Sequence, residues 1–247
     1  CALPIFSLQP WQEQLLFLRL MYKSTFRMPT FNDLYYYRLG NRSLRPEKAN
    51  EYNMGITWSR SFSSFLNYLS VTVDGYYNDV TDKIVAFPTT YAWKMANYGK
   101  VHVTGMDATL AAAASLGKNM VLVVSGGYTW QKAIDLTDAT SKSYKDQLPY
   151  TPKHSGNVSA VLEMPWVNVG YSIVGVSERY SMSQNIPENR IDGYMEHTAS
   201  LSRNFSFRHC KLRLQAEIIN MTDTQYDVIK YYPMPGRSWR LTGTIEF

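Results

Sequence analysis

Hydrophobic and polar residues alternate along most of this chain with the two-residue period of a β-strand. The segment 69–78 is the clearest case. One set of alternate positions holds Leu69, Val71, Val73, Gly75 and Tyr77, and the other holds Ser70, Thr72, Asp74, Tyr76 and Asn78. A helix would scatter both sets around its circumference, whereas a strand places them on opposite faces. The pattern predicts a strand.

The same alternation recurs often enough to predict about ten antiparallel strands. The predicted strands cover residues 16–23, 51–59, 69–78, 101–112, 120–131, 155–163, 167–176, 194–202, 211–218 and 238–247. No run of roughly 18 apolar residues occurs, so no transmembrane helix is expected. We expect an all-β chain that forms a single domain over residues 1–247.

Alternating strands fit either a transmembrane β-barrel or a two-layer sandwich with one solvated face. Two features favour the barrel. Apolar rows end in aromatic residues at Trp58, Tyr77 and Trp130, as expected at a membrane interface. The opposite faces carry full charges such as Arg213 and Glu217, as a water-filled lumen permits.

The predicted connections alternate between short and long. Short turns fall at 60–64, 115–118, 164–166 and 204–209, and long connections at 29–46, 84–98, 133–152, 181–191 and 222–236. A barrel with tight periplasmic turns and long extracellular loops has this rhythm. In that arrangement the last strand descends and Phe247 ends in the periplasm. Pro29 and Pro46 bracket the first loop, and Asn220 and Asp223 suit a turn.

Composition agrees with a membrane barrel. Only 18% of residues are charged, against about a quarter in soluble domains, while the mean hydropathy of −0.29 is too polar for a helical membrane bundle. A Tyr-rich soluble secreted β-protein would share this composition. The net charge of +5 is dispersed, which argues against nucleic-acid binding.

The two cysteines, Cys1 and Cys210, give no disulfide framework and no zinc-type spacing. Because the chain starts at Cys1 without a leader, we expect an upstream portion to be missing. A lipid-modified Cys1 is the alternative.

Candidate catalytic chemistry is sparse. Four histidines occur without a metalloprotease pair, and we expect each to be a strand or loop-end residue. The carboxylates form no assignable acid–base pair. We therefore expect no enzyme, no cofactor and no metal, although Asp135 and Asp138 have the oxygen ligands that Ca²⁺ accepts.

Several strings, in this order and spacing, carry a family resemblance. They are Phe26-Arg-Met-Pro-Thr-Phe-Asn-Asp-Leu-Tyr-Tyr36 with Gly40-Asn41 and Leu44-Arg-Pro-Glu-Lys48, Tyr77-Asn-Asp-Val-Thr-Asp-Lys-Ile84, Asn97-Tyr-Gly-Lys-Val101 with Gly105, Leu148-Pro-Tyr-Thr-Pro152, Ile219-Asn-Met-Thr-Asp-Thr-Gln-Tyr226, and Pro233-Met-Pro-Gly-Arg-Ser-Trp239. From about Leu15 onward the chain resembles the C-terminal barrel portion of TonB-dependent outer-membrane receptors, and Bacteroidetes-type members of the cobalamin and siderophore group in particular.

The resemblance implies a multi-pass protein in the outer membrane of a Gram-negative bacterium. The family barrel has about 22 strands around a plug, so this chain would supply the last ten or so, without the plug and its TonB box. The implied function is import of a bulky, scarce nutrient, cobalamin or a ferric siderophore. Haem receptors of the family carry a histidine that is missing from the span 30–40 here. A passive porin-like barrel or an adhesin is the alternative.

The implied partners are outer-membrane lipid, the TonB complex through the missing N-terminal region, the barrel-assembly machinery and a surface lipoprotein that captures substrate.

Two sets of candidate site residues follow. Aromatic side chains with one arginine on the long loops suit a large planar or amphipathic ligand; they are Tyr35, Tyr36, Arg38, Tyr91, Trp93 and Tyr231. Packing between loops or a place in the interfacial girdle is the alternative for these aromatics. The last strand carries an alternating row that resembles the assembly signal and also fits a simple lipid-facing strand; it comprises Trp239, Leu241, Ile245 and Phe247.

Overall fold

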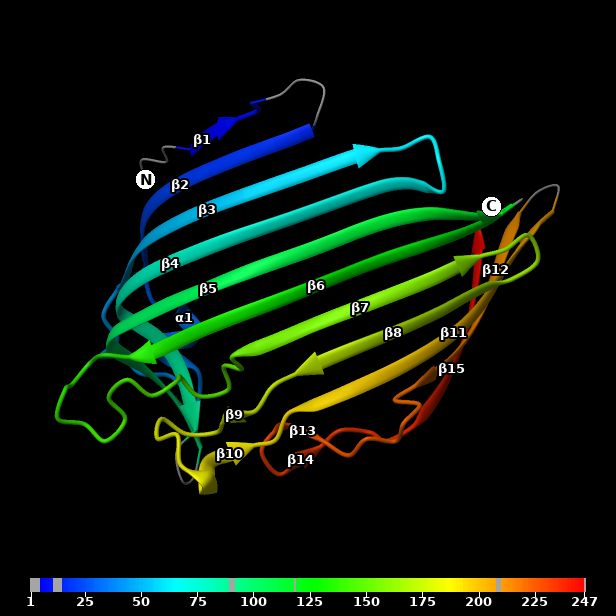
Figure 1. Ribbon diagram of the computed structural model, residues 1–247. Helices are drawn as coiled ribbons and strands as arrows, with labels where there is room; N and C mark the ends of the chain where they lie inside the picture. Colours follow the sequence, from blue (N-terminus) through cyan, green and yellow to red (C-terminus); the bar gives the residue numbers. More distant parts are fainter. Residues whose placement is uncertain (1–4, 11–14, 89–91, 118, 208–209, 247) are drawn as a thin grey trace.

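The computed structural model describes residues 5–10, 15–88, 92–117, 119–207 and 210–246, and most of them form one antiparallel sheet (Figure 1). Its eleven strands follow the order β1-β2-β3-β4-β5-β6-β7-β8-β11-β12-β15. They are β1 (Ile5–Leu8), β2 (Leu15–Arg27), β3 (Glu47–Ser61), β4 (Leu66–Pro88), β5 (Trp93–Gly117), β6 (Met120–Asp135), β7 (His154–Glu163), β8 (Asn168–Val176), β11 (Tyr194–Ser206), β12 (Lys211–Ile219) and β15 (Ser238–Glu246).

The sheet is a curved wall and not a closed barrel. Strands β1 and β15 lie at its two edges and do not pair with each other. All ten predicted strands are present, so the all-β prediction is confirmed. Strand β1 was not predicted, because four residues are too few to show an alternating pattern.

The wall has one polar face and one apolar face. Across β2–β6 one row of the polar face contains Arg19, Gly55, Asp74, Asp107 and Thr129. An Arg19 guanidinium nitrogen lies 2.9 Å from an Asp74 carboxylate oxygen. Gly55 stands between them, and a Cβ there would lie 2.0 Å from that carboxylate. The glycine makes room for an ion pair that spans three strands.

The apolar face lies uncovered in the structure. Met54 is 64% exposed, Leu214 46% and Leu241 85%. Apart from the wall, the described residues form only two two-stranded sheets, so no second layer covers this face. The exposure of these side chains rules out the two-layer sandwich.

All long connections lie at one end of the wall (Figure 1), and we call them together the loop rim. They span residues 28–46, 136–153, 177–193 and 220–237. The rim contains α1 (Phe31–Tyr35), β9 (Arg179–Tyr180), η1 (Pro187–Asn189), β10 (Arg190–Ile191), β13 (Asp227–Ile229) and β14 (Tyr232–Pro233). None of the helices among the described residues has the length and apolarity to cross a membrane.

The predicted long connection at 84–98 is wrong. Strands β4 and β5 continue pairing as far as Pro88 and Trp93. Asp82 takes a left-handed φ of 54°, yet the pairing with β5 keeps the same register on either side of it. Beyond it, Ile84 and Met95 are buried with Leu44 from loop 28–46. Contact with a distant loop therefore gives this hairpin extension an apolar partner.

A second buried cluster lies on the polar face, where Leu148 of loop 136–153 packs against Val80, Val101 and Ala133. The Leu148 amide donates to the Ala133 carbonyl at 2.9 Å. Loop 136–153 therefore folds back over the polar face. Both buried apolar clusters belong to the rim and the strand ends beside it.

Candidate functional site

Loop 28–46 begins with a capped helical turn. The Thr30 hydroxyl accepts from the Asp33 amide at 3.2 Å, and the Asp33 carboxylate accepts from the Thr30 amide at 2.8 Å. Arg27 also lies 2.9 Å from this carboxylate. Burial acts to raise the pKa of Asp33, but the bonds from Thr30 and Arg27 outweigh it and leave the pKa below its ordinary value. The charge of Asp33 thus helps to order the loop.

The same loop is fastened to the β4–β5 hairpin. The Asn41 side-chain Nδ2 donates to the Met95 carbonyl at 3.0 Å, and the Met95 backbone amide donates to the Leu39 carbonyl at 2.9 Å. The Asn97 side chain accepts from the Arg45 amide at 2.8 Å and donates to the Arg45 carbonyl at 3.0 Å. Residues of the strings at 26–48 and 97–101 therefore hold the loop in place.

The aromatic residues of loop 28–46 remain exposed on this framework. Tyr36 is exposed, Tyr37 is 79% exposed, and Tyr35 lies beside the guanidinium of Arg42, 5.2 Å from the ring centre. Arg38 has a φ of 63° and lies over the Tyr37 ring at 5.1 Å. The structure brings the predicted residues Tyr35, Tyr36 and Arg38 together on one exposed loop.

Trp93 links the hairpin to two further loops. Its ring centre is 5.5 Å from that of Tyr150, and the Tyr150 amide donates to the Tyr180 carbonyl at 2.7 Å. Burial raises the pKa of the Tyr150 phenol. Trp93 therefore belongs partly to loop packing, the alternative considered for these aromatics. Tyr91 lies outside the described residues.

Arg179 ties loop 177–193 to loop 220–237. It is 5% exposed, and one guanidinium nitrogen donates to the carbonyls of Asp227 at 2.6 Å and Val228 at 3.0 Å. The guanidinium also lies 5.8 Å from the centre of the Tyr194 ring. This buried cation joins two loops that are far apart in sequence.

Tyr226 extends this cluster over the polar face. Its ring stacks on Tyr194 with centres 3.9 Å apart, and its hydroxyl donates to Glu196 at 2.5 Å. Burial, then the hydrogen bond and negative charge of Glu196, raise the pKa of Tyr226 strongly. Sequence reasoning missed Arg179, Tyr194, Glu196 and Tyr226 as a cluster. The one signal was Tyr226 within the string 219–226.

Tyr231 projects from the last loop and is 82% exposed, with a φ of 68°. Its amide donates to the Asp227 carboxylate at 2.9 Å. The neighbouring Lys230 ammonium donates to the Glu188 carbonyl. Asn220, fully buried, adopts a φ of 52° and accepts from the Thr224 amide at 2.9 Å, which confirms the predicted turn. The rim is thus a cross-linked platform with exposed aromatic side chains.

Comparison with known proteins decides the family. The family model described as "TonB dependent receptor-like, beta-barrel" matches residues 6–221. The chain belongs to the TonB-dependent receptor β-barrel family. Vitamin B12 transporter BtuB of Photobacterium profundum is 25% identical over 230 residues, which cover 90% of this chain and 34% of that protein. BtuB of Vibrio vulnificus is 26% identical over 231 residues, covering 90% and 33%.

Solved structures of the family share the fold. The unliganded ferric citrate transporter FecA superposes with a TM-score of 0.73 at 16% identity, covering 96% of this chain and 36% of that one. The copper transporter OprC gives a TM-score of 0.70 at 15% identity, covering 98% and 38%. This chain spans about a third of the length of the curated relatives it matches. It corresponds to part of a TonB-dependent receptor barrel, a family of receptors and transporters in the outer membrane.

The described histidines of this family member lie on strands, as predicted. His102, His154 and His197 each lie beside a tyrosine hydroxyl on the apolar face. His209 lies outside the described residues. Within the ranges that the structure describes, no group of three or more His, Cys, Asp or Glu side chains could hold a metal ion. Asp135 and Asp138 instead accept from the Thr137 and Thr140 amides at 2.9 and 2.8 Å.

The last strand has its predicted alternation. Trp239, Leu241 and Ile245 are exposed on the apolar face, and Ser238 and Arg240 lie on the polar face. An Arg240 nitrogen lies 2.5 Å from the Glu217 carboxylate. Phe247 lies outside the described residues. Recognition of this row by the assembly machinery stays a prediction.

Proposed function

We propose that this chain is the C-terminal barrel wall of an outer-membrane importer that takes up a bulky, scarce nutrient, cobalamin or a ferric siderophore. The polar face then lines the lumen and the apolar face contacts lipid. The loop rim faces the outside, and the last strand ends on the periplasmic side. The TonB box and plug belong to the part of the receptor that precedes this chain.

This proposal depends on one observation: the loops of the rim are fastened to one another or to the hairpin, while several of their aromatic side chains stay exposed. Hydrogen bonds and ring contacts join loops 28–46, 136–153, 177–193 and 220–237 to one another or to the β4–β5 hairpin. Tyr36, Tyr37 and Tyr231 nevertheless keep their rings exposed. Rigid aromatic side chains offer contact area at a low cost in conformational entropy, which suits a large amphipathic ligand.

The relatives support the substrate class. The curated matches are vitamin B12 transporters, and the structural neighbours include a ferric citrate transporter. The span 30–40 contains no histidine, which disfavours haem. We further propose the TonB complex, the barrel-assembly machinery and a surface lipoprotein for substrate capture as partners of the whole receptor.

The test is uptake by cells that carry the full-length gene or its deletion, with cobalamin and ferric siderophores supplied separately. We expect deletion to abolish TonB-dependent uptake of one of them. Replacing Tyr35, Tyr36 and Arg38 together by alanine should weaken binding of that nutrient about 100-fold, since hot-spot aromatic and arginine side chains each contribute more than about 1 kcal/mol. Lys142→Ala in loop 136–153 is the control.

Unchanged uptake of every nutrient after deletion would contradict the proposed substrate class. Uptake that persists without TonB would favour the passive porin-like barrel instead. An adhesin would show a loss of surface attachment with no change in uptake.

A further inference from the structure

The apolar face of β3, β4 and β5 changes character in steps along the strands. Starting from the loop rim, each row takes one residue from each strand. The rows are Lys48-Thr81-Lys100, Asn50-Asp79-His102, Tyr52-Tyr77-Thr104, and Met54-Gly75-Met106. From the first row to the fourth, the side chains therefore change from cationic, through polar and aromatic, to apolar.

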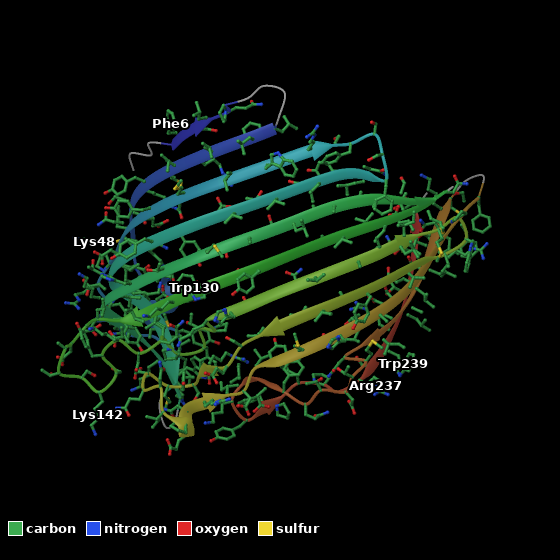
Figure 2. The ribbon with its side chains drawn as sticks, viewed as in Figure 1. Phe6, Lys48, Trp130, Lys142, Arg237 and Trp239 are labelled. Carbon is green, nitrogen blue, oxygen red and sulfur yellow. The ribbon has the colours of Figure 1, made fainter. Side chains whose placement is uncertain are left out.

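The first row carries two lysines on either side of a hydroxyl. Lys48, Thr81 and Lys100 are all exposed. Within the described residues neither lysine makes an ion pair. Two strand spacings separate them, about 10 Å between Cα atoms, so both flexible ammonium groups can reach one anion near Thr81. Lys48 stands close to the rim (Figure 2).

A belt of rings follows below the lysines. The ring centres of Tyr22 and Tyr52 are 5.0 Å apart, those of Tyr52 and Tyr77 6.3 Å, and those of Tyr77 and His102 5.5 Å. Amphipathic rings collect at the level of lipid headgroups. The same Tyr–His pairing recurs further along the face, at 2.7 Å between Tyr128 and His154 and at 2.7 Å between Tyr171 and His197.

Below the belt the face is hollowed into an apolar groove of about 610 Å³. Its lining includes Phe6, Leu20, Tyr52, Met54, Gly75 and Tyr77. Gly75 leaves the floor open, because a Cβ there would meet only the Met54 carbonyl oxygen at 3.9 Å. Thr81 lies six positions after Gly75 along β4, about 20 Å of extended strand. An acyl chain that starts at the ring belt therefore reaches the groove.

We propose that this surface is a binding site for an anionic lipid of the outer leaflet. Lys48, Thr81 and Lys100 bind its headgroup phosphate, and one acyl chain lies in the groove over Gly75. This site rests on the proposed function, which turns the apolar face toward lipid. The charge pattern selects the ligand: a zwitterionic lipid gives the lysine row no net anion, and a free phosphate gives the groove no chain.

Binding of the lipid headgroup by the lysine row is tested by native mass spectrometry of the full-length receptor in detergent. The probes are dimyristoyl phosphatidic acid, dimyristoyl phosphatidylcholine and inorganic phosphate. We expect preferential binding of the phosphatidic acid, and a loss of about 30-fold in its affinity for Lys48→Gln/Lys100→Gln, since each basic residue near a lipid surface contributes about a factor of five. Lys94→Gln/Lys142→Gln removes the same charge elsewhere and should change little.

Binding of the acyl chain is tested by a substitution that fills the groove. Gly75→Leu has room for its Cβ, so we expect the folded receptor to lose affinity for the dimyristoyl lipid but not for dihexanoyl phosphatidic acid. The matched control is Gly175→Leu on the same face, where a Cβ meets only the flexible Met195 side chain at 3.8 Å. Cargo uptake should be unchanged in all four variants.

Equal binding of both dimyristoyl lipids, or equal competition by inorganic phosphate, would overturn the site. An equal loss of phosphatidic acid affinity in Lys94→Gln/Lys142→Gln would also overturn it. These outcomes are separate from failure of the proposed function, which would appear as unaltered nutrient uptake after gene deletion while lipid binding stands.

Discussion

The wall and the loop rim of this protein bury their apolar residues in different ways. In the wall, Leu214 and Leu241 project from the sheet, and none of the described segments forms a layer over them. In the rim, Leu44, Ile84 and Met95 are buried against one another by contacts between a loop and a hairpin. In the proposed function lipid covers the apolar face of the wall, whereas the rim buries its apolar residues through contacts between its own loops and the hairpin. Substitutions in the two regions should fail for different reasons.

The largest expected effect is on the lipid side of the wall. Leu214→Arg in the full-length receptor places a charge toward the hydrocarbon, at a cost of about 2–4 kcal/mol near the midplane. We expect a lower yield of folded, heat-resistant barrel on a gel, and a lower free energy of folding into lipid vesicles. Gln215→Arg, its neighbour on the polar face, is the control and should fold normally. Equal damage from both variants would contradict the assignment of the two faces.

In the rim the largest effect should come from its small apolar cluster. Leu44→Ala should cost about 2–3 kcal/mol of local stability, because it leaves a cavity beside Ile84 and Met95. Hydrogen exchange should then be faster in loop 28–46 and at the end of the β4–β5 hairpin, with the wall unchanged. Phe31→Ala, at an exposed position, should have little effect. Faster exchange throughout the wall would show that rim and wall are one cooperative unit.

Arg179→Met should have a smaller effect, of about 1–3 kcal/mol, because it removes the donor to two loop carbonyls while keeping most of the side-chain volume. We expect faster proteolysis within loop 220–237. The Arg190 side chain makes exposed ion pairs with Glu178 and Asp192, so Arg190→Met is the control variant. If both variants are cleaved at the parental rate, the guanidinium does not hold the loops together.

The smallest effect is on pH dependence. The pKa of Asp33 is below its ordinary value when the loop is folded, so its ionised form favours the folded loop. That contribution is present above the unfolded pKa and is lost as the pH falls through the folded one. The protection factors of amides in loop 28–46, which compare the measured exchange with the intrinsic rate at each pH, should therefore fall under acid conditions. Asp33→Asn should flatten this response, and Asp138→Asn, in a separate loop, should leave it intact.

The fold was predictable because alternation along a strand is a local property. Each of the ten predicted strands is present, and the faces assigned to segments such as 69–78 are the faces observed. The prediction was wrong at 84–98, where Leu44 supplies a partner from far away in the chain. The prediction missed β1 because a strand of four residues is too short to show an alternating pattern.

The candidate site was less predictable. Tyr35, Tyr36, Arg38 and Tyr231 stand exposed on the rim, as loop residues of their kind suggested. No sequence pattern relates Arg179 to Asp227, or Trp93 to Tyr150, because those contacts depend on how separate loops fold over one another. Contacts between loops follow no repeating spacing along the chain, so they leave no pattern in the sequence.

The sequence by itself determined the strands, their two faces and the family, since periodic side chains and ordered motif strings are written along the chain. Only the tertiary structure decided which residues share a row. The register of β3, β4 and β5 aligns Lys48, Thr81 and Lys100, and the loop contacts bury Arg179 against Tyr194. Register and loop packing are set by hydrogen bonds and contacts between distant segments, so neither is visible one residue at a time.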